Sequence, residues 1–105
     1  MYIGFINKKM RKVCENHSVA VKKLGSRNAD LLSQRILEMK AADNLQVLRA
    51  LPAPRCHPLL GDRNGQYAVD LVNPKRLVFL PVTEQGMTIE NLVTDVTIIE
   101  IIDYH

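Results

Sequence analysis

The amino-acid sequence predicts an α+β fold: a small antiparallel sheet of about four to five strands, with two to three N-terminal helices packed on one face. Three observations support this prediction. A short apolar stretch opens the chain, apolar residues then recur at helical spacing, and after Pro54 the sequence alternates as strands separated by turns. This element order is typical of a small α+β domain. With 105 residues, 47% of them hydrophobic, the chain can build one core, so residues 1–105 are expected to form a single domain.

The first part of the chain carries a strand and then a helical pattern. Residues 2–6 are apolar, with β-branched and aromatic side chains that are typical of a strand. Asn7 is expected to cap a helix that carries the basic residues of 8–12. A second helical turn, or a bend of the same helix, is expected over Val19–Leu24 and should end at Gly25.

The clearest helix is expected from about residue 27 to 42, with Ser26 as its cap. Its apolar residues recur at spacings of three, four and three, and should pack on the sheet; they are Ala29, Leu32, Ile36 and Met39. Arg35 and Glu38 are expected on the other side of the helix. A short helical turn should follow at residues 45–48, before the prolines that end the helical half.

The second half opens with a predicted hairpin. Asn64 and Gly65 tolerate the positive φ values of a two-residue type I′ turn, and the alternating strand Gln66–Val72 follows. His57 therefore lies on or just before the other arm. Pro58 cannot donate a hydrogen bond to a neighbouring strand, so this arm is expected to be short, bulged or at a sheet edge.

Two further strands complete the predicted sheet. Residues 76–80 should form one of them, with Arg76 on the face opposite Leu77. After a loop, the β-branched run Val96–Ile102 is typical of a central strand that is covered on both faces. The alternation places Glu100 on the same face as the isoleucines two residues before and after it, where it must reach solvent or find a partner.

The two halves of the chain differ in charge. Residues 1–55 hold 11 Lys and Arg against 4 Asp and Glu, whereas residues 56–105 hold 3 against 7, so the halves carry +7 and −4. The basic half is the candidate surface for a polyanion. Taken alone, the run of Lys8, Lys9, Arg11 and Lys12 is also typical of an ordinary solvated helix face.

The cysteines and the apolar runs bear on localisation. Cys14 and Cys56 show no CxxC spacing, so neither a disulfide framework nor a zinc ribbon is indicated. The N-terminus is apolar first and basic second, the reverse of a secretory signal, and no run approaches the roughly 18 apolar residues of a membrane span. We therefore expect a soluble, unprocessed cytoplasmic protein that does not bind membranes.

The candidate site lies where three strands of the predicted sheet meet its uncovered face. Arg76 projects from one strand, His57 from another, and Asp103, Tyr104 and His105 follow a third. Histidine can take up or release a proton near neutral pH, and arginine binds phosphate oxygens through a planar fork. Asp103 could orient a histidine or help to remove a proton, and Tyr104 could stack on a base or bind a phosphate.

Several segments together resemble the HigB-type toxins of the RelE/ParE superfamily, also called plasmid maintenance killer proteins. The helical half is similar in style, from Asn7 through Gly25. The more specific segments are Cys56-His57-Pro58-Leu59, Gly61-Asp62-Arg63-Asn64-Gly65-Gln66, Lys75-Arg76-Leu77-Val78-Phe79 and Ile101-Ile102-Asp103-Tyr104-His105. The resemblance covers the whole chain.

The resemblance implies a toxin that cleaves mRNA on the translating ribosome and is neutralised by a small helix-turn-helix antitoxin of the HigA type. It implies metal-free chemistry without a cofactor, in which the ribose 2′-hydroxyl attacks the adjacent phosphate and the 5′-oxygen leaves. By position it implies an active site made of His57, Arg76, Asp103, Tyr104 and His105. The RNA-binding residues are then expected to be Lys8, Lys9, Arg11, Lys12, Arg63 and Lys75.

The chain departs from the family pattern at two positions. Many relatives carry lysine where this chain has Leu60, and an aromatic residue where it has Lys75. Lys75 should point away from the face that carries Arg76, because neighbouring residues of a strand alternate. These departures affect the expected rate and sequence preference more than the reaction class.

Four alternatives remain open at this stage. Arg63 is also typical of a contact within the hairpin. A zinc site of Cys56, His57 and His105 has suitable ligand types, but adjacent strand residues face opposite ways. The chain could instead be a toxin of the ParE branch, which poisons DNA gyrase, or an interaction module without catalytic activity. The sequence does not assign acid and base between the two histidines.

Overall fold

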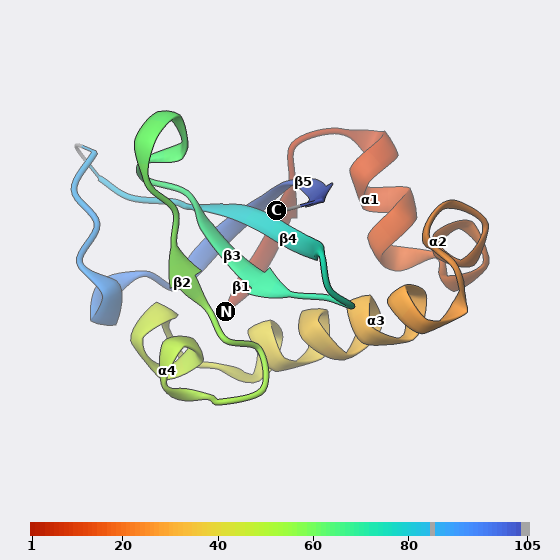
Figure 1. Ribbon diagram of the computed structural model, residues 1–105. Coiled ribbons are helices and arrows are strands. Elements are labelled where there is room, and N and C mark those ends of the chain that lie inside the picture. The colour runs from red at the N-terminus through yellow and green to blue at the C-terminus, as the bar shows by residue number, and fades with distance from the viewer. Residues whose placement is uncertain (85, 104–105) are drawn as a thin grey trace.

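A computed structural model describes residues 1–84 and 86–103 of the chain, and its described part contains four α-helices, two short 3₁₀ helices and a five-stranded sheet. The sheet order is β1-β5-β4-β3-β2 (Figure 1). The bounds are β1 Tyr2–Phe5, α1 Lys8–Glu15, α2 His17–Leu24, α3 Ser26–Ala41, α4 Leu45–Ala50, β2 His57–Pro58, β3 Tyr67–Asp70, β4 Lys75–Pro81 and β5 Asp95–Asp103. The predicted α+β class and the order of its elements are confirmed.

The sheet is mixed because its first strand runs with its last. β1 pairs with β5 in parallel, whereas β5, β4, β3 and β2 are joined as antiparallel neighbours. The helical half connects β1 to β2 across the sheet, so β1 and β2 occupy opposite edges. Four α-helices stand where two to three were predicted, because the helical turns expected at Val19–Leu24 and at residues 45–48 are the separate helices α2 and α4. Asn16 separates α1 from α2, and its side chain accepts a hydrogen bond from the Val19 amide at 3.3 Å.

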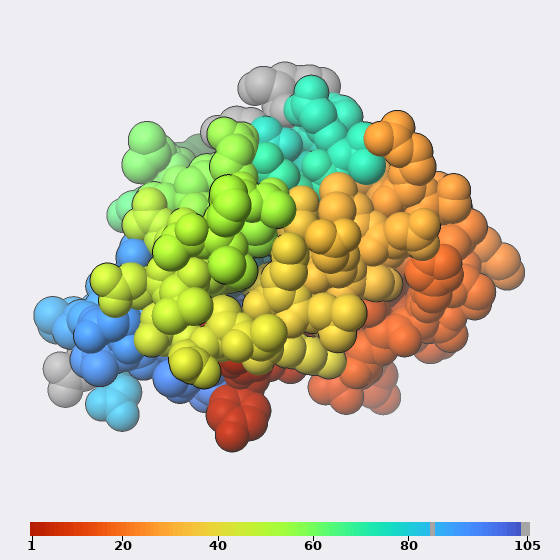
Figure 2. Space-filling model, turned by 90° about the horizontal axis from the view of Figure 1, so that it is seen from below, coloured from red at the N-terminus to blue at the C-terminus, as the bar shows by residue number. Residues whose placement is uncertain are grey.

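The hydrophobic core lies between the helices and one face of the sheet. The predicted stripe of α3 is buried as expected, with Ala29, Leu32 and Met39 at most 1% exposed. It packs in one cluster with sheet residues that include Val69, Leu77, Phe79 and Ile98. Figure 2 shows α3, α4 and the segment after them forming a continuous layer over this side of the molecule. Burial of each of the larger side chains, the leucines, Val69, Met39, Phe79 and Ile98, contributes about 1.5–3 kcal/mol, so the helices are held on this face and the other face stays open.

A β-bulge changes the predicted face of one residue in β5. Val78 of β4 lies opposite Glu100, but the next residue, Phe79, lies opposite Ile98, so Ile99 is the additional residue. Ile98 is therefore buried in the core on the helix face, and Glu100 lies on the other face beside Val78. The prediction that Glu100 shares a face with Ile98 is wrong, because a strict alternation cannot contain an inserted residue.

The turn before β3 also differs from the prediction. A short 3₁₀ helix spans Gly61–Arg63, and Asn64 has φ −54° and ψ 134°, followed by Gly65 with φ 92°. The Gln66 amide donates to the Arg63 carbonyl at 3.0 Å, which closes a type II turn. The two-residue type I′ hairpin is therefore wrong: Asn64 keeps a negative φ, and only Gly65 needs the left-handed region.

The start of α3 is a smaller correction. Ser26 is the first helical residue, and the cap position belongs to Gly25, whose φ is 84°. Glycine adopts this backbone conformation without the steric cost that a side chain would add.

Within the described residues, no helix is both long and apolar enough to cross a membrane.

Candidate functional site

The candidate site lies on the sheet face opposite the helices, called the open face below. His57 pairs with Ala68, and Ala68 pairs with Val78, so these three side chains leave the sheet on one side. Two residues further along their strands, Asp70 pairs with Arg76 on the same side. Ala68 and Val78 form a small apolar cluster with Leu59, and Ile99 and Ile102 pack against this cluster. The structure therefore brings His57 and Arg76 to one face, as predicted.

The ring of His57 is oriented by a hydrogen bond to the backbone. Its Nδ1 lies 2.8 Å from the carbonyl oxygen of Arg55. A carbonyl oxygen can only accept a hydrogen bond, so Nδ1 carries a proton in this geometry and Nε2 is the nitrogen that gains or loses one. A histidine in this tautomer can accept a proton through Nε2 from a ligand on the open face.

Arg76 is held across the β3–β4 pair by Asp70. Its Nε lies 3.0 Å from Oδ1 of Asp70, and its Nη1 donates to the carbonyl of Lys75 at 3.2 Å. The Arg76 side chain is 12% exposed. Arginine stays charged at all physiological pH values, so Arg76 supplies a fixed, oriented positive charge beside the apolar cluster.

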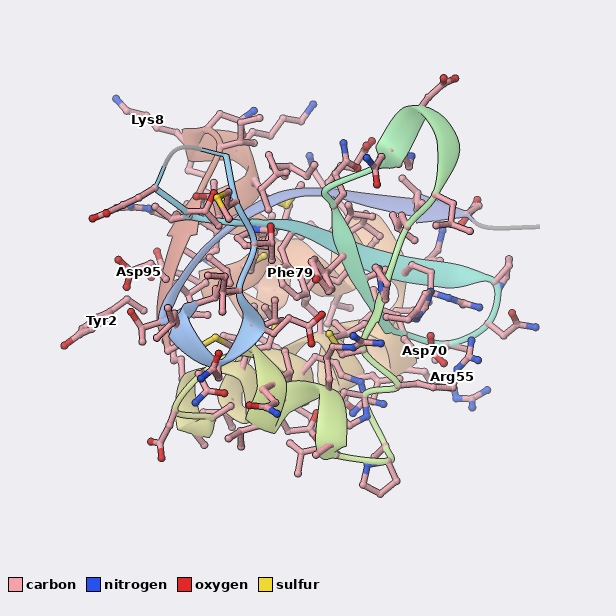
Figure 3. The ribbon with its side chains drawn as sticks, turned by 90° about the vertical axis from the view of Figure 1, so that its left-hand side faces the viewer. Tyr2, Lys8, Arg55, Asp70, Phe79 and Asp95 are labelled. Atoms are coloured by element: carbon pink, nitrogen blue, oxygen red, sulfur yellow. The ribbon has the colours of Figure 1, made fainter. Side chains whose placement is uncertain are left out.

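The same carboxylate binds a second arginine that precedes His57. Nε of Arg55 donates to Oδ2 of Asp70 at 2.7 Å, and Figure 3 shows the two side chains together at one side of the molecule. The hydrogen bond that Arg55 donates to Asp70, together with the negative charge of that carboxylate, raises the pKa of Arg55. Arg55 has φ 48°, which places a non-glycine residue in the left-handed region. One residue thus orients His57 through its carbonyl and contacts Asp70 through its guanidinium.

A third arginine, on the helix side of the sheet, binds the backbone of Asp70 and of the segment before β2. Arg35 of α3 donates to the carbonyls of Asp70 at 2.7 Å and Ala53 at 3.1 Å, and forms an ion pair with Glu38 at 2.7 Å. Arg35 is only 6% exposed, so its predicted position on the outer side of the helix is wrong. The chain segment before β2 crosses this flank of α3, and its carbonyl groups need a donor there. We call Arg35, Arg55, Arg76 and Asp70 the arginine cluster.

The predicted residue Asp103 is placed differently from His57 and Arg76. Asp103 pairs with Lys75, and their side chains form an ion pair at 2.8 Å. Ile102, not Asp103, lies opposite Arg76, so Asp103 and Arg76 leave the sheet on opposite faces. The same register directs Lys75 away from the face of Arg76, as predicted. Tyr104 and His105 lie outside the described residues.

The residues predicted to bind RNA fall into two environments. Lys8, Lys9, Arg11 and Lys12 are all exposed on α1, where Arg11 lies 3.8 Å from Glu15 and 5.5 Å from the centre of the Phe5 ring. Arg63 instead pairs with Glu100 and donates to Gln66 at 2.9 Å, the contact within the turn region that the sequence left open. Figure 3 places Lys8 and the Arg55–Asp70 pair on different sides of the molecule.

The neighbour of His57 faces the opposite way. Cys56 is 6% exposed and belongs to the main core, whereas His57 lies on the open face. Burial in particular raises the pKa of the Cys56 thiol to about 12, with a smaller contribution from Glu90. This arrangement separates two of the three ligands of the zinc alternative. Among the described residues, no three His, Cys, Asp or Glu side chains are grouped so that they could hold a metal ion.

Sequence reasoning missed Asp70 and two of the arginines that contact it, Arg35 and Arg55. A signal for Asp70 was present: if Tyr67, Val69 and Leu71 face the core, then Ala68 and Asp70 must share the face of Arg76. Arg55 lies in an irregular segment, where no periodicity applies. Taken together, the open face presents a proton acceptor, Nε2 of His57, and two guanidinium groups oriented by one carboxylate, which suits a ligand that carries a phosphate and an ionisable hydroxyl.

Comparison with known proteins finds a similar fold among solved structures but no similar sequence. No protein-family model matches this sequence, and neither does any curated protein sequence. Among solved structures, the chain is similar to one described as a YoeB/ParE toxin from Agrobacterium tumefaciens, with a TM-score of 0.58 and 12% sequence identity. The match covers 100% of this chain and 99% of that chain. The protein therefore has the fold of a YoeB/ParE toxin over its whole length.

Proposed function

We propose that this protein is the toxin of a type II toxin–antitoxin system and acts as a metal-independent, ribosome-dependent mRNA endonuclease. The observation that carries the proposal is the placement of His57 and Arg76 on one sheet face, with Nε2 of His57 able to accept a proton. The toxin-like fold supports the general class. The sequence segments similar to HigB-type toxins support the finer assignment to a HigB-like enzyme that a HigA-like helix-turn-helix antitoxin neutralises.

The proposed reaction begins with the ribose 2′-hydroxyl. Nε2 of His57 takes the proton from this hydroxyl, whose oxygen then forms a bond to the adjacent phosphorus. Arg76 stabilises the negative charge that builds up on the phosphate oxygens. The bond from phosphorus to the 5′-oxygen breaks, which leaves a cyclic 2′,3′-phosphate on one fragment and a 5′-hydroxyl on the other.

The leaving 5′-oxygen needs a proton from a second donor. His105 is the sequence-based candidate for this role, and Tyr104 for a contact with the base or the phosphate. The side chain of Asp103 pairs with Lys75 on the other face of the sheet from Arg76. In the proposed site, Asp103 would therefore help to position Tyr104 and His105 and would not contact the substrate itself.

The test is primer extension on a defined mRNA, with and without translating ribosomes. His57→Ala should lower the cleavage rate roughly 10²- to 10⁴-fold, the usual contribution of one positioned proton transfer. A chain lacking His105 should also lose activity. His17→Ala is the matched control, because His17 is an exposed histidine that pairs with Asp30 on the helical half. Intact mRNA in every lane from folded protein, or equal cleavage by wild type and His57→Ala, would contradict the proposal.

A second candidate is a toxin of the same fold that acts on DNA gyrase. Two observations favour it: the name of the similar structure includes ParE, and Asp103 does not share the face of His57. In that case purified protein should inhibit supercoiling by gyrase, and His57→Ala should inhibit equally well. A protein that neither cleaves mRNA nor inhibits gyrase, yet binds the product of a neighbouring helix-turn-helix gene, would be an interaction module.

A further inference from the structure

We propose that Arg55 is a second phosphate-binding residue of the open face and that Asp70 positions both Arg55 and Arg76 for this role. The ligand would be a phosphodiester of a single-stranded RNA. The inference rests on the proposed function, because it gives the substrate of that site a further contact. It assigns a role to two residues that neither the residue pattern nor the sequence resemblance singled out.

The shared carboxylate is the first step of the argument. Nε of Arg55 lies 2.7 Å from Oδ2 of Asp70, and Nε of Arg76 lies 3.0 Å from Oδ1 of the same carboxylate. Two groups bound to one carboxylate are necessarily close neighbours. Arg55 donates a hydrogen bond to Asp70 through Nε, and Nε of Arg76 forms an ion pair with the other oxygen, so Asp70 contributes to the orientation of both guanidinium groups. Two arginine forks side by side match the several oxygens of a phosphodiester.

The second step is that Asp70 itself is fixed. Its amide donates to the carbonyl of Pro54 at 2.8 Å, and its carbonyl accepts from Arg35 at 2.7 Å. Its backbone is therefore tied to the segment before β2 and to α3. A carboxylate on a backbone held from two sides can orient long side chains precisely enough for a binding site, whereas a mobile one cannot.

The third step is the availability and place of Arg55. Its side chain is 64% exposed, and among the described residues the structure gives its Nη atoms no acceptor. A guanidinium has five N–H donors, and the bond to Asp70 uses only the one on Nε. The Arg55 carbonyl also accepts the hydrogen bond from His57. The Arg55 guanidinium is bound at Asp70, two residues along β3 from Ala68, the partner of His57, so its free donors belong to the same part of the open face as the proposed proton acceptor.

Binding of an uncleavable ligand tests Arg55 without depending on catalysis. The probe is a fluorescently labelled single-stranded oligonucleotide with 2′-O-methyl riboses, followed by anisotropy. Arg55→Gln should weaken binding roughly tenfold or more, the effect expected when a charge-assisted hydrogen bond is lost. Arg55→Lys, which keeps the charge but not the fork, should fall between Arg55→Gln and wild type. Arg27→Gln, which removes an exposed arginine of α3, should change binding less than about twofold.

The positioning role of Asp70 needs its own measurement. In Asp70→Asn the negative charge is lost and an NH₂ donor replaces one of the two carboxylate oxygens, so the side chain can no longer pair with both arginines. We expect kcat to fall while KM stays the same or decreases, and the NMR signals of the two arginine Nε–H groups to broaden. Unchanged arginine signals with unchanged kcat would overturn the role of Asp70. Circular dichroism establishes that the variant is folded.

The outcomes separate the inference from the proposed function. If wild type cleaves mRNA and Arg55→Gln binds the oligonucleotide as tightly as Arg27→Gln does, then the inference is wrong and the nuclease proposal stands. If wild type cleaves nothing and Arg55→Gln still loses oligonucleotide binding, then the nuclease proposal is wrong and the phosphate site stands.

Discussion

The protein has two concentrations of positive charge that are built in opposite ways. In α1, Lys8, Lys9, Arg11 and Lys12 are consecutive or nearly so, and all are exposed. The three arginines of the arginine cluster come from α3, from the segment before β2, and from β4. Contacts of 2.7–3.2 Å to two carboxylates and three backbone carbonyls hold them in place. The comparison shows that charge density along the sequence does not reveal where charge is oriented.

The physical consequences of the two arrangements differ. Exposed charges attract a polyanion over about a Debye length, roughly 8 Å at physiological salt, and an exposed ion pair contributes at most about 1 kcal/mol. Charges held in fixed geometry next to an apolar surface are screened less and contact individual atoms of a ligand. We therefore expect α1 to affect association and the arginine cluster to affect stability and catalysis.

Removing the buried arginine should have the largest effect on the fold. Arg35→Met keeps the length of the side chain but leaves Glu38 and the carbonyls of Ala53 and Asp70 without their donor. We expect a loss of about 3 kcal/mol in the free energy of unfolding, as for a broken buried ion pair. Lys12→Met on α1 is the control and should cost less than about 0.5 kcal/mol. Urea denaturation measures both, and equal losses would contradict the comparison.

The next largest effect should be on cleavage. In the proposed active site Arg76 stabilises the reacting phosphate, so Arg76→Ala should lower kcat roughly 10²- to 10³-fold, as for the loss of one transition-state contact. Arg11→Ala removes an arginine from α1 and should leave kcat within about twofold. Single-turnover cleavage on programmed ribosomes separates kcat from binding. A comparable loss of kcat in Arg11→Ala would place α1 in the active site instead.

A smaller effect is expected from the basic helix, and on binding only. The triple variant Lys8→Gln, Lys9→Gln and Lys12→Gln removes up to three contacts with phosphates. The slope of the logarithm of affinity for single-stranded RNA against the logarithm of salt concentration should become less steep by roughly 2. Affinity measured by anisotropy between 50 and 200 mM salt gives this slope. An unchanged slope would mean that α1 is only a solvated helix face.

The smallest expected effect is on the pH dependence of stability, and it comes from one cysteine in each region: Cys14 in α1 and Cys56 next to Arg55 of the arginine cluster. Burial chiefly raises the pKa of both the Cys14 thiol in α1 and the Cys56 thiol next to Arg55 to about 12. The fold favours the protonated thiol, so this stabilisation is complete below about pH 9, the ordinary pKa, and is lost as pH rises toward 12. For Cys56 we expect a loss of about 1 kcal/mol in unfolding free energy between pH 9 and 10.

Cysteine variants identify which thiol causes this loss. Cys56→Ala should make the free energy of unfolding decline less steeply with pH than in wild type. Cys14→Ala measures the part of this decline that the thiol in α1 causes. Urea denaturation at pH 7, 9 and 10 measures the decline. Identical slopes in wild type and in both variants would show that neither thiol resists ionisation in the fold.

The sequence by itself determined the fold class and half of the candidate site. The spacing of Ala29, Leu32, Ile36 and Met39 identifies the buried face of α3, because a helix returns to the same side every 3.6 residues. The alternation in β4 places Arg76 opposite Leu77, and the proline after His57 indicates a short edge strand. These are local periodicities, which a single segment carries without reference to the rest of the chain.

Only the tertiary structure decided the strand register and the convergence of the arginines. The inserted Ile99 moves Glu100 to the open face, and the pairing with Lys75 moves Asp103 away from Arg76. Register depends on how two distant strands align, and no periodicity within one strand records it. Arg35 and Arg55 meet Asp70 because a helix, an irregular segment and a strand cross at one point. That crossing is a property of the packed chain, so residues far apart in the sequence become one site only when the core has formed.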